Sequence, residues 1–146
     1  MNKAENSKLL TFLRTSPYLL VGLEMSVDEI IHKVLRYKPF FDTSGGGVTL
    51  SGGEPTLPME FTSLLLRRFK EEGIHTLLEA AGLFDFERFV SMILPYTDTI
   101  FFDIKIIDPS EHERYCGVGN ESILRNFVLL HEKAKTGDFE LLPPHL

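Results

Sequence analysis

Gly46-Gly-Val-Thr-Leu-Ser-Gly-Gly-Glu-Pro55 is the stretch that decides the fold of this chain of 146 residues. Its centre, residues 48–50, is a short apolar run bounded by glycine and proline. A run of this kind predicts a buried strand between a flexible loop and a turn. A helix should follow over about residues 58–72, with Pro58 near its start and Gly73 as its C-terminal stop.

Two more strand–helix units follow along the chain. Residues 75–79 have the pattern of a strand, and Asp85 should cap a helix that ends near Pro95. Residues 99–107 form a strongly apolar run that predicts a third strand. The three predicted strands are therefore separated from one another by single helices.

The spacing of these strands decides the fold class. Leu50, Leu78 and Ile104 lie one in each strand, 28 and then 26 residues apart. A βαβ unit takes about 30 residues. Apolar strands that alternate with amphipathic helices indicate a parallel sheet covered by helices. We expect an α/β fold with a parallel sheet of βα units.

The segment before this region contains one more predicted helix. Ser26 and Glu29 have the spacing of a capping box, and the apolar residues after them fall at helical intervals. The helix should end near Tyr37, because Pro39 disfavours helical geometry in the residue before it.

The two ends of the chain frame the expected domain. A further helix should open at Asn120 or Glu121. We expect the core to cover residues 25–134. Residues 1–24 form an N-terminal segment that the pattern does not assign, and residues 135–146, with their proline pair, should form a loosely ordered tail.

Polar residues follow all three strands, at the carboxyl ends where parallel α/β folds bind ligands. A glycine pair lets a ligand approach the backbone, a carboxylate can accept hydrogen bonds from an ammonium group, and a lysine can pair with a carboxylate. Such a rim suits the amino-acid part of a small zwitterion. The predicted rim consists of Gly52, Gly53, Glu54, Glu79, Asp103 and Lys105.

Each rim residue also has a plain structural interpretation. A single Gly-Gly pair after a strand is more often a tight turn, and a lone carboxylate there usually caps a helix or is solvated. Asp103 and Lys105 share one face of a strand and could form a structural ion pair. The recurrence of polar groups at three successive strand ends favours a binding site.

The composition of the chain limits which kinds of partner it can bind and where in the cell it is expected to lie. An apolar content of 43% with 25% charged residues is typical of a globular domain. The net charge of −6 and the scattered basic residues argue against nucleic acid. No signal pattern or long apolar run is present, so we expect a cytoplasmic protein without membrane contact. The histidines show no metal-ligand spacing, and we expect no metal site.

Five stretches, taken in order and spacing, cover about residues 25–130. They are Met25-Ser-Val-Asp-Glu-Ile30, Gly46-Gly-Val-Thr-Leu-Ser-Gly-Gly-Glu-Pro55, Leu78-Glu-Ala-Ala-Gly82, Phe102-Asp-Ile-Lys105 and Gly117-Val-Gly-Asn-Glu-Ser-Ile-Leu-Arg-Asn126. As a set they resemble the glycyl-radical-enzyme activating enzymes of the radical SAM class, such as pyruvate formate-lyase activating enzyme.

The resemblance implies a fold, two cofactors and a partner. The family fold is a partial (βα) barrel. A [4Fe–4S] cluster on a CxxxCxxC motif reductively cleaves S-adenosylmethionine, and the resulting 5′-deoxyadenosyl radical abstracts a hydrogen from a glycine of the partner glycyl radical enzyme. By position, Gly52, Gly53 and Glu54 would hold the methionine amino group. Glu79 and Asp103 match the next acidic positions, and Lys105 matches the lysine near the carboxylate.

Several residues depart from the family pattern. A cubane cluster needs at least three cysteine ligands from the protein, and Cys116 is the only cysteine. It matches no cluster position and is expected to be a semi-buried thiol. Ala80 and Ala81 stand where polar residues are usual, and residues 139–146 show no equivalent of the family's next strand. The chain therefore resembles the middle of the partial barrel, which is incomplete here.

Two functions remain open, with no catalytic residue assigned to this chain. One is an activase fragment that is inactive alone for lack of cluster ligands. The other is a non-catalytic module that binds S-adenosylmethionine or the partner. Residues 50–54 also resemble the signature of ABC transporters, but no GxxxxGK[ST] phosphate loop accompanies them. The unpaired edges of a partial barrel further predict self-association.

Overall fold

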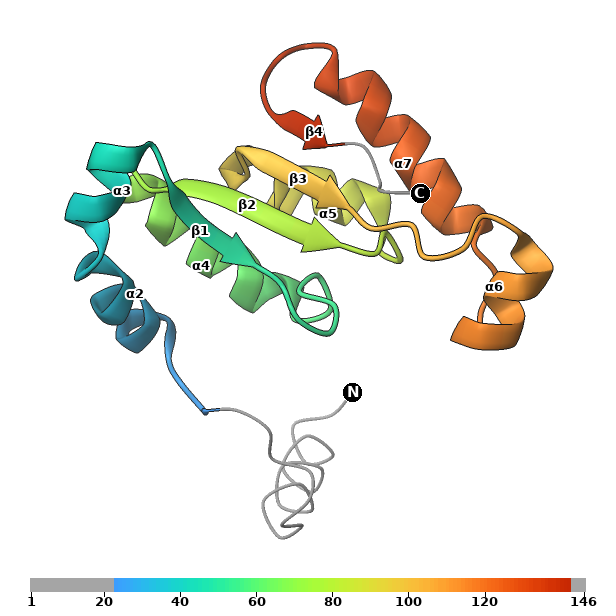
Figure 1. The fold of residues 1–146 in the computed structure, drawn as a ribbon, viewed down its shortest axis with the longest axis horizontal. Helices are drawn as coiled ribbons and strands as arrows, with labels where there is room; N and C mark the ends of the chain where they lie inside the picture. Colours follow the sequence, from blue (N-terminus) through green and yellow to red (C-terminus); the bar gives the residue numbers. More distant parts are fainter. Residues whose placement is uncertain (1–22, 143–146) are drawn as a thin grey trace, which may run out of the picture.

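The computed structural model describes residues 23–142 and forms one layer of strands with helices packed against it (Figure 1). The strands alternate with helices along most of the chain. The elements are α2 (Val27–Leu35), α3 (Lys38–Ser44), β1 (Gly47–Leu50), α4 (Met59–Glu71), β2 (His75–Ala80), α5 (Phe86–Met92), the 3₁₀ turn η1 (Leu94–Tyr96), β3 (Thr99–Phe102), α6 (Pro109–Cys116), α7 (Glu121–Ala134) and β4 (Glu140–Leu142).

The four strands form one parallel sheet in the order β1-β2-β3-β4. Leu50 pairs in register with Leu78, and Leu78 pairs with Ile100. The parallel α/β fold predicted from the strand spacing is therefore confirmed.

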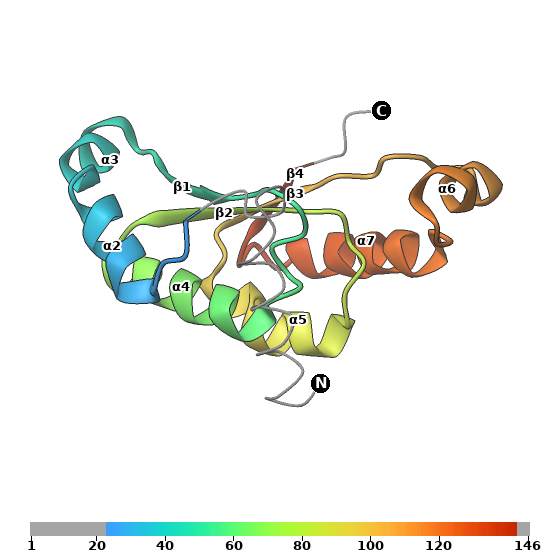
Figure 2. The ribbon, with the colours of Figure 1, turned by 90° about the horizontal axis from the view of Figure 1, so that it is seen from below.

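Helices α4, α5 and α7 lie together on one face of the sheet, which Figure 2 shows edge-on. The main core lies between them and the strands, and it includes the fully buried Leu78, Phe89, Ile100 and Phe102. Burying a side chain of this size contributes roughly 1.5–3 kcal/mol. Strand residues therefore alternate, with one set facing the helices and Glu79 among the half-buried residues of the other set.

A second, smaller core joins α2 to α4 through Ile31, Leu65 and Phe69. The helix α2 begins with the predicted capping box: Ser26 N donates to Glu29 at 2.7 Å, and Glu29 N donates to Ser26 Oγ at 3.3 Å. The Asp85 cap of α5 is also confirmed, since its carboxylate accepts from Arg88 N at 2.9 Å.

The prediction of a loop before β1 is wrong for residues 38–44, because these residues form the helix α3. Pro39 lies in the first turn of this helix. The backbone N–H groups of a first turn have no partner within the helix, so proline loses nothing there. Helix α2 already ends at Leu35, and Lys38, before the proline, is the first residue of α3.

The third strand is shorter than predicted, because β3 ends at Phe102 and residues 103–107 are irregular. Asp103 N still donates to Ala80 O at 2.9 Å, and the chain then leaves the sheet. The carbonyl groups of Ile106 and Ile107 are bound by a side chain, Asn120, and not by a neighbouring strand. The apolar run over residues 99–107 therefore extends beyond the end of the strand, and its length did not predict where the strand ends.

The expectation that residues 135–146 form a loosely ordered tail is wrong for residues 140–142, which form β4. Phe139 is buried in the main core, and Glu140 N donates to Asp98 O at 2.8 Å. These contacts align β4 with β3, and Ile100 pairs with Leu141. A run of three residues is too short to show a strand period, so only its packing identifies it.

Cys116 lies at the end of α6 and is exposed, so the expected semi-buried thiol is wrong. Figure 1 shows α6 at the far end of the molecule from α2 and α3. Only His112 of this helix is buried, and its Nδ1 lies 2.7 Å from Val118 O.

Within residues 23–142, every helix falls short of the length and apolarity that a membrane crossing requires.

Candidate functional site

The loop after β1 presents bare backbone to open space. Gly52 has φ = 103°, a conformation that favours glycine. Gly53 does not have a positive φ, so its backbone conformation does not require glycine. A Cβ added at either glycine would meet no protein atom within 4 Å. The packing of the protein therefore does not explain Gly53, whereas a ligand that approaches the backbone would.

Glu54 follows the two glycines, and its carboxylate binds the protein itself. Oε1 accepts from Thr56 N at 3.0 Å and from Thr56 Oγ1 at 2.6 Å. Oε2 accepts from Ala81 N at 2.8 Å, in the loop after β2. Because a carboxylate has about four acceptor positions, three of them are used here. Glu54 thus joins two rim loops to each other.

Glu79 lies on β2, opposite the end of β1. Its Oε2 accepts from Ser51 Oγ at 2.6 Å. The register that pairs Leu50 with Leu78 places the next residues, Ser51 and Glu79, side by side. Ser51 was not among the predicted rim residues. The strict pairing of parallel strands is the signal that could have found it, but the register is visible only in the structure.

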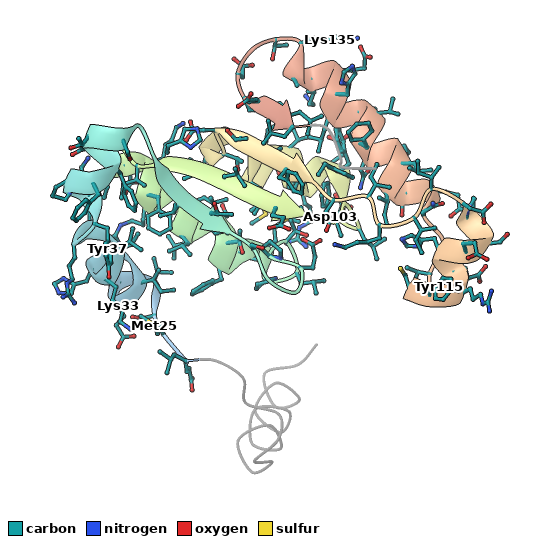
Figure 3. The ribbon with its side chains drawn as sticks, in the orientation of Figure 1. Met25, Lys33, Tyr37, Asp103, Tyr115 and Lys135 are labelled. Atoms are coloured by element: carbon teal, nitrogen blue, oxygen red, sulfur yellow. The ribbon has the colours of Figure 1, made fainter. Side chains whose placement is uncertain are left out.

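Asp103 and Lys105 lie just past the carboxyl end of β3, where Figure 3 labels Asp103. The Lys105 ammonium donates to Asp103 Oδ2, so the ion pair considered for these residues exists. The Lys105 side chain is 61% exposed. An ion pair that is this open to solvent contributes little to stability, about 0–1 kcal/mol, and leaves the ammonium group accessible to a ligand.

These strand ends enclose a hollow of about 260 Å³. Two carboxylates and one ammonium group therefore lie around a floor of exposed backbone. Its lining residues are Ser51, Gly52, Gly53, Glu79, Ala80, Ala81, Asp103 and Lys105.

The structure brings together five of the six predicted rim residues in this hollow, all except Glu54. Glu54 supports the rim from beside it, through Ala81 N. Ala80 and Ala81 line the hollow, and Ala81 contributes the N–H that holds Glu54. The convergence predicted from three strand ends is thus observed as geometry.

The chain matches the family described as the radical SAM superfamily over residues 15–145. The (2S)-3-sulfopropanediol dehydratase activating enzyme of Klebsiella oxytoca is 43% identical over 111 residues, which are 76% of this chain and 35% of that protein. Pyruvate formate-lyase-activating enzyme of Staphylococcus aureus is 46% identical over 110 residues, which are 72% of this chain and 43% of that protein.

A solved domain of pyruvate-formate lyase-activating enzyme from Bacteroides vulgatus has the same fold, with a TM-score of 0.54 and 33% identity. The match covers 66% of this chain and 56% of that one. The chain spans about two-fifths of the length of the curated relatives named above. The resemblance that the sequence motifs predicted is confirmed, and this chain belongs to the radical SAM superfamily.

Proposed function

We propose that the hollow at the ends of β1, β2 and β3 binds the amino-acid part of S-adenosylmethionine, and that the chain is the corresponding part of a glycyl-radical-enzyme activating enzyme. The observation that carries the proposal is the set of opposed charges around exposed glycine backbone. Among the relatives, two bear the names of activating enzymes for a dehydratase and for pyruvate formate-lyase. The partner proposed for the whole protein is therefore a glycyl radical enzyme.

The residues of the hollow fit the methionine moiety. Its ammonium group can lie against Glu79 and Asp103, and its carboxylate can lie against Lys105. Gly53 leaves space that a side chain would fill. Glu54 supports this arrangement by holding Ala81, and one acceptor position of its carboxylate remains for the ligand's ammonium group. When bound and reduced in this family, S-adenosylmethionine supplies the radical that acts on the partner's glycine.

The residues of this chain do not fit a [4Fe–4S] cluster. A cluster needs at least three thiolate ligands, and the sequence contains one cysteine, which is exposed at the end of α6. Residues 23–142 also bring together no group of three His, Cys, Asp or Glu side chains with which to hold a metal ion. The described residues therefore offer no ligand set for a cluster.

The single cysteine favours a second candidate function, a non-catalytic module that binds S-adenosylmethionine or the partner. Anaerobic reconstitution of the chain with iron and sulfide addresses this point. We expect no stoichiometric [4Fe–4S] absorption in the visible range. A stoichiometric cluster on the monomer would contradict the assignment, and a Cys116→Ala control would identify any iron bound through the one thiol.

Isothermal titration of the chain with S-adenosylmethionine tests the proposed site. Lys105→Met should weaken binding about tenfold, since one charge-assisted hydrogen bond is lost at an open site. Lys133 is exposed on the far part of α7, so Lys133→Met is the matched control and should leave the affinity unchanged. Equal affinities for the wild type and both variants would refute the role of Lys105.

A further inference from the structure

Two fully buried asparagines, Asn120 and Asn126, lie at the start of α7 and within it. Both are 0% exposed. Neither caps the helix with its side chain. Each instead points its amide nitrogen at main-chain carbonyl groups of a different loop, and both loops border the hollow described above.

Asn126 binds the loop that follows β2. Its Nδ2 donates to Gly82 O and to Phe84 O, both at 2.9 Å. This loop begins with Ala81, whose N–H holds Glu54. Gly82 packs closely against Phe102, because a Cβ added there would lie 2.2 Å from the phenyl ring. The loop is therefore held by Glu54 on one side and by Asn126 on the other.

Asn120 binds the loop that follows β3. Its Nδ2 donates to Ile106 O at 3.0 Å and to Ile107 O at 2.7 Å. These carbonyl groups come directly after Lys105, the residue proposed to meet the ligand's carboxylate. The irregular backbone after β3 thus receives two hydrogen bonds from this one side chain.

The orientation of both amides follows from chemistry, since a main-chain carbonyl can only accept. The amide oxygen of each side chain is buried, and no partner for it is found among residues 23–142. Burying an unpaired acceptor is unfavourable, so each amide contributes through its two donated hydrogen bonds and not through its oxygen.

We infer that Asn120 and Asn126 are positioning residues of the rim, and that each holds one of the two loops that shape the hollow. The ligand part of this inference rests on the proposed function, whereas the loop part does not. Asn126 sets the position of the β2 loop and Asn120 that of the β3 loop. A loss at one asparagine should therefore act on its own loop and spare the other.

Amide hydrogen exchange of the whole chain by NMR tests this separation. Two protected N–H groups report on the two loops: Ala81 N, which donates to Glu54, and Asp103 N, which donates to Ala80 O. In Asn126→Ala, exchange at Ala81 should accelerate about tenfold or more while exchange at Asp103 stays unchanged, because only one loop loses its restraint. Asn120→Ala should give the reverse pattern.

A general loss of stability would accelerate both reporters equally in both variants, and that result would overturn the inference. If the variants do not fold, a measurement on the wild-type chain tests the inference instead. The side-chain amide protons of Asn120 and Asn126 should exchange slowly in the wild type, as buried and bonded groups do. Exchange at the rate of a free asparagine amide would refute the contacts.

The link to the ligand has its own readout. S-adenosylmethionine should bind to each alanine variant several-fold more weakly than to the wild type, because the rim is less well organised before binding. Unchanged affinity in both variants would overturn the positioning role toward the ligand. A wild-type chain that does not bind at millimolar concentration refutes the proposed function instead, and the exchange pattern still decides the loop inference.

Discussion

The two ends of the parallel sheet carry the same kinds of charged residue and use them differently. At the amino end, Asp98 Oδ2 accepts from Thr76 N at 2.9 Å and from Thr76 Oγ1 at 3.1 Å, and Oδ1 accepts from the Lys70 ammonium. At the carboxyl end, the Lys105 side chain is 61% exposed, and the Asp103 carboxylate accepts from Lys105, two residues along the chain. Donors from α4 and β2 hold the first carboxylate in three hydrogen bonds, whereas the second ion pair is local and its lysine remains exposed.

The comparison shows that hollow size does not identify the site. A larger hollow, about 510 Å³, lies at the amino end and is lined in part by Asp98, Lys135 and Glu140. Figure 3 labels Lys135 at the end of α7, away from Asp103. The central carboxylate of that hollow already serves as a structural acceptor. Available hydrogen-bonding capacity, and not volume, distinguishes the two ends.

Removal of Asp98 should have the largest effect on stability. Asp98→Ala leaves Thr76 N and the Lys70 ammonium without their acceptor, which should cost about 2 kcal/mol of unfolding free energy. Urea unfolding followed by circular dichroism measures it. Asp138 is exposed and borders the same hollow, so Asp138→Ala is the matched control and should change stability by less than about 0.5 kcal/mol.

A methyl group at the carboxyl end should affect binding and not stability. Gly53→Ala adds a Cβ that meets no protein atom, so unfolding should change by less than about 0.5 kcal/mol while S-adenosylmethionine binds about tenfold more weakly. Gly82→Ala is the contrasting control. Its φ of 89° and its contact with Phe102 should destabilise the fold itself. A loss of stability in Gly53→Ala would contradict the conclusion that the carboxyl end is free to bind a ligand and is not needed for folding.

The pH dependence of stability sharpens the comparison with a smaller effect. Burial raises the pKa of Asp98, but the hydrogen bonds from Lys70 and Thr76 outweigh it and hold the pKa below its ordinary value. A carboxylate with a lowered folded-state pKa stabilises the protein above its unfolded pKa of about 4 and loses this contribution as pH falls through the folded value.

Urea unfolding of wild type and Asp98→Asn at several pH values measures this linkage. The stability difference between the two proteins should be full near pH 6 and shrink below about pH 4. The exposed carboxylates with lowered pKa values, such as Glu29 and Glu132, are present in both proteins and cancel. A difference that stays constant to the lowest pH at which both fold would contradict the structural role of the ionised Asp98.

The sequence was sufficient to predict the βα units and the composition of the rim. Leu50, Leu78 and the capping residues Ser26 and Asp85 lie where local pattern places them, because periodicity and caps are properties of neighbouring residues. Ser51 and the roles of Asn120 and Asn126 were missed. Their partners lie 28, 13 and 42 residues away or more, and contacts at such separations leave no trace in a local pattern.

The sequence by itself determined which chemical groups follow each strand: two glycines, three carboxylates and a lysine at three strand ends. It also determined the alternation that makes the sheet parallel. Only the tertiary structure decided how those groups are used. Packing fixed the register that joins Ser51 to Glu79, engaged Glu54 with Ala81, and added β4 to the sheet. The physical reason is that a polar group remains available for a ligand only where the fold brings it too few partners of its own.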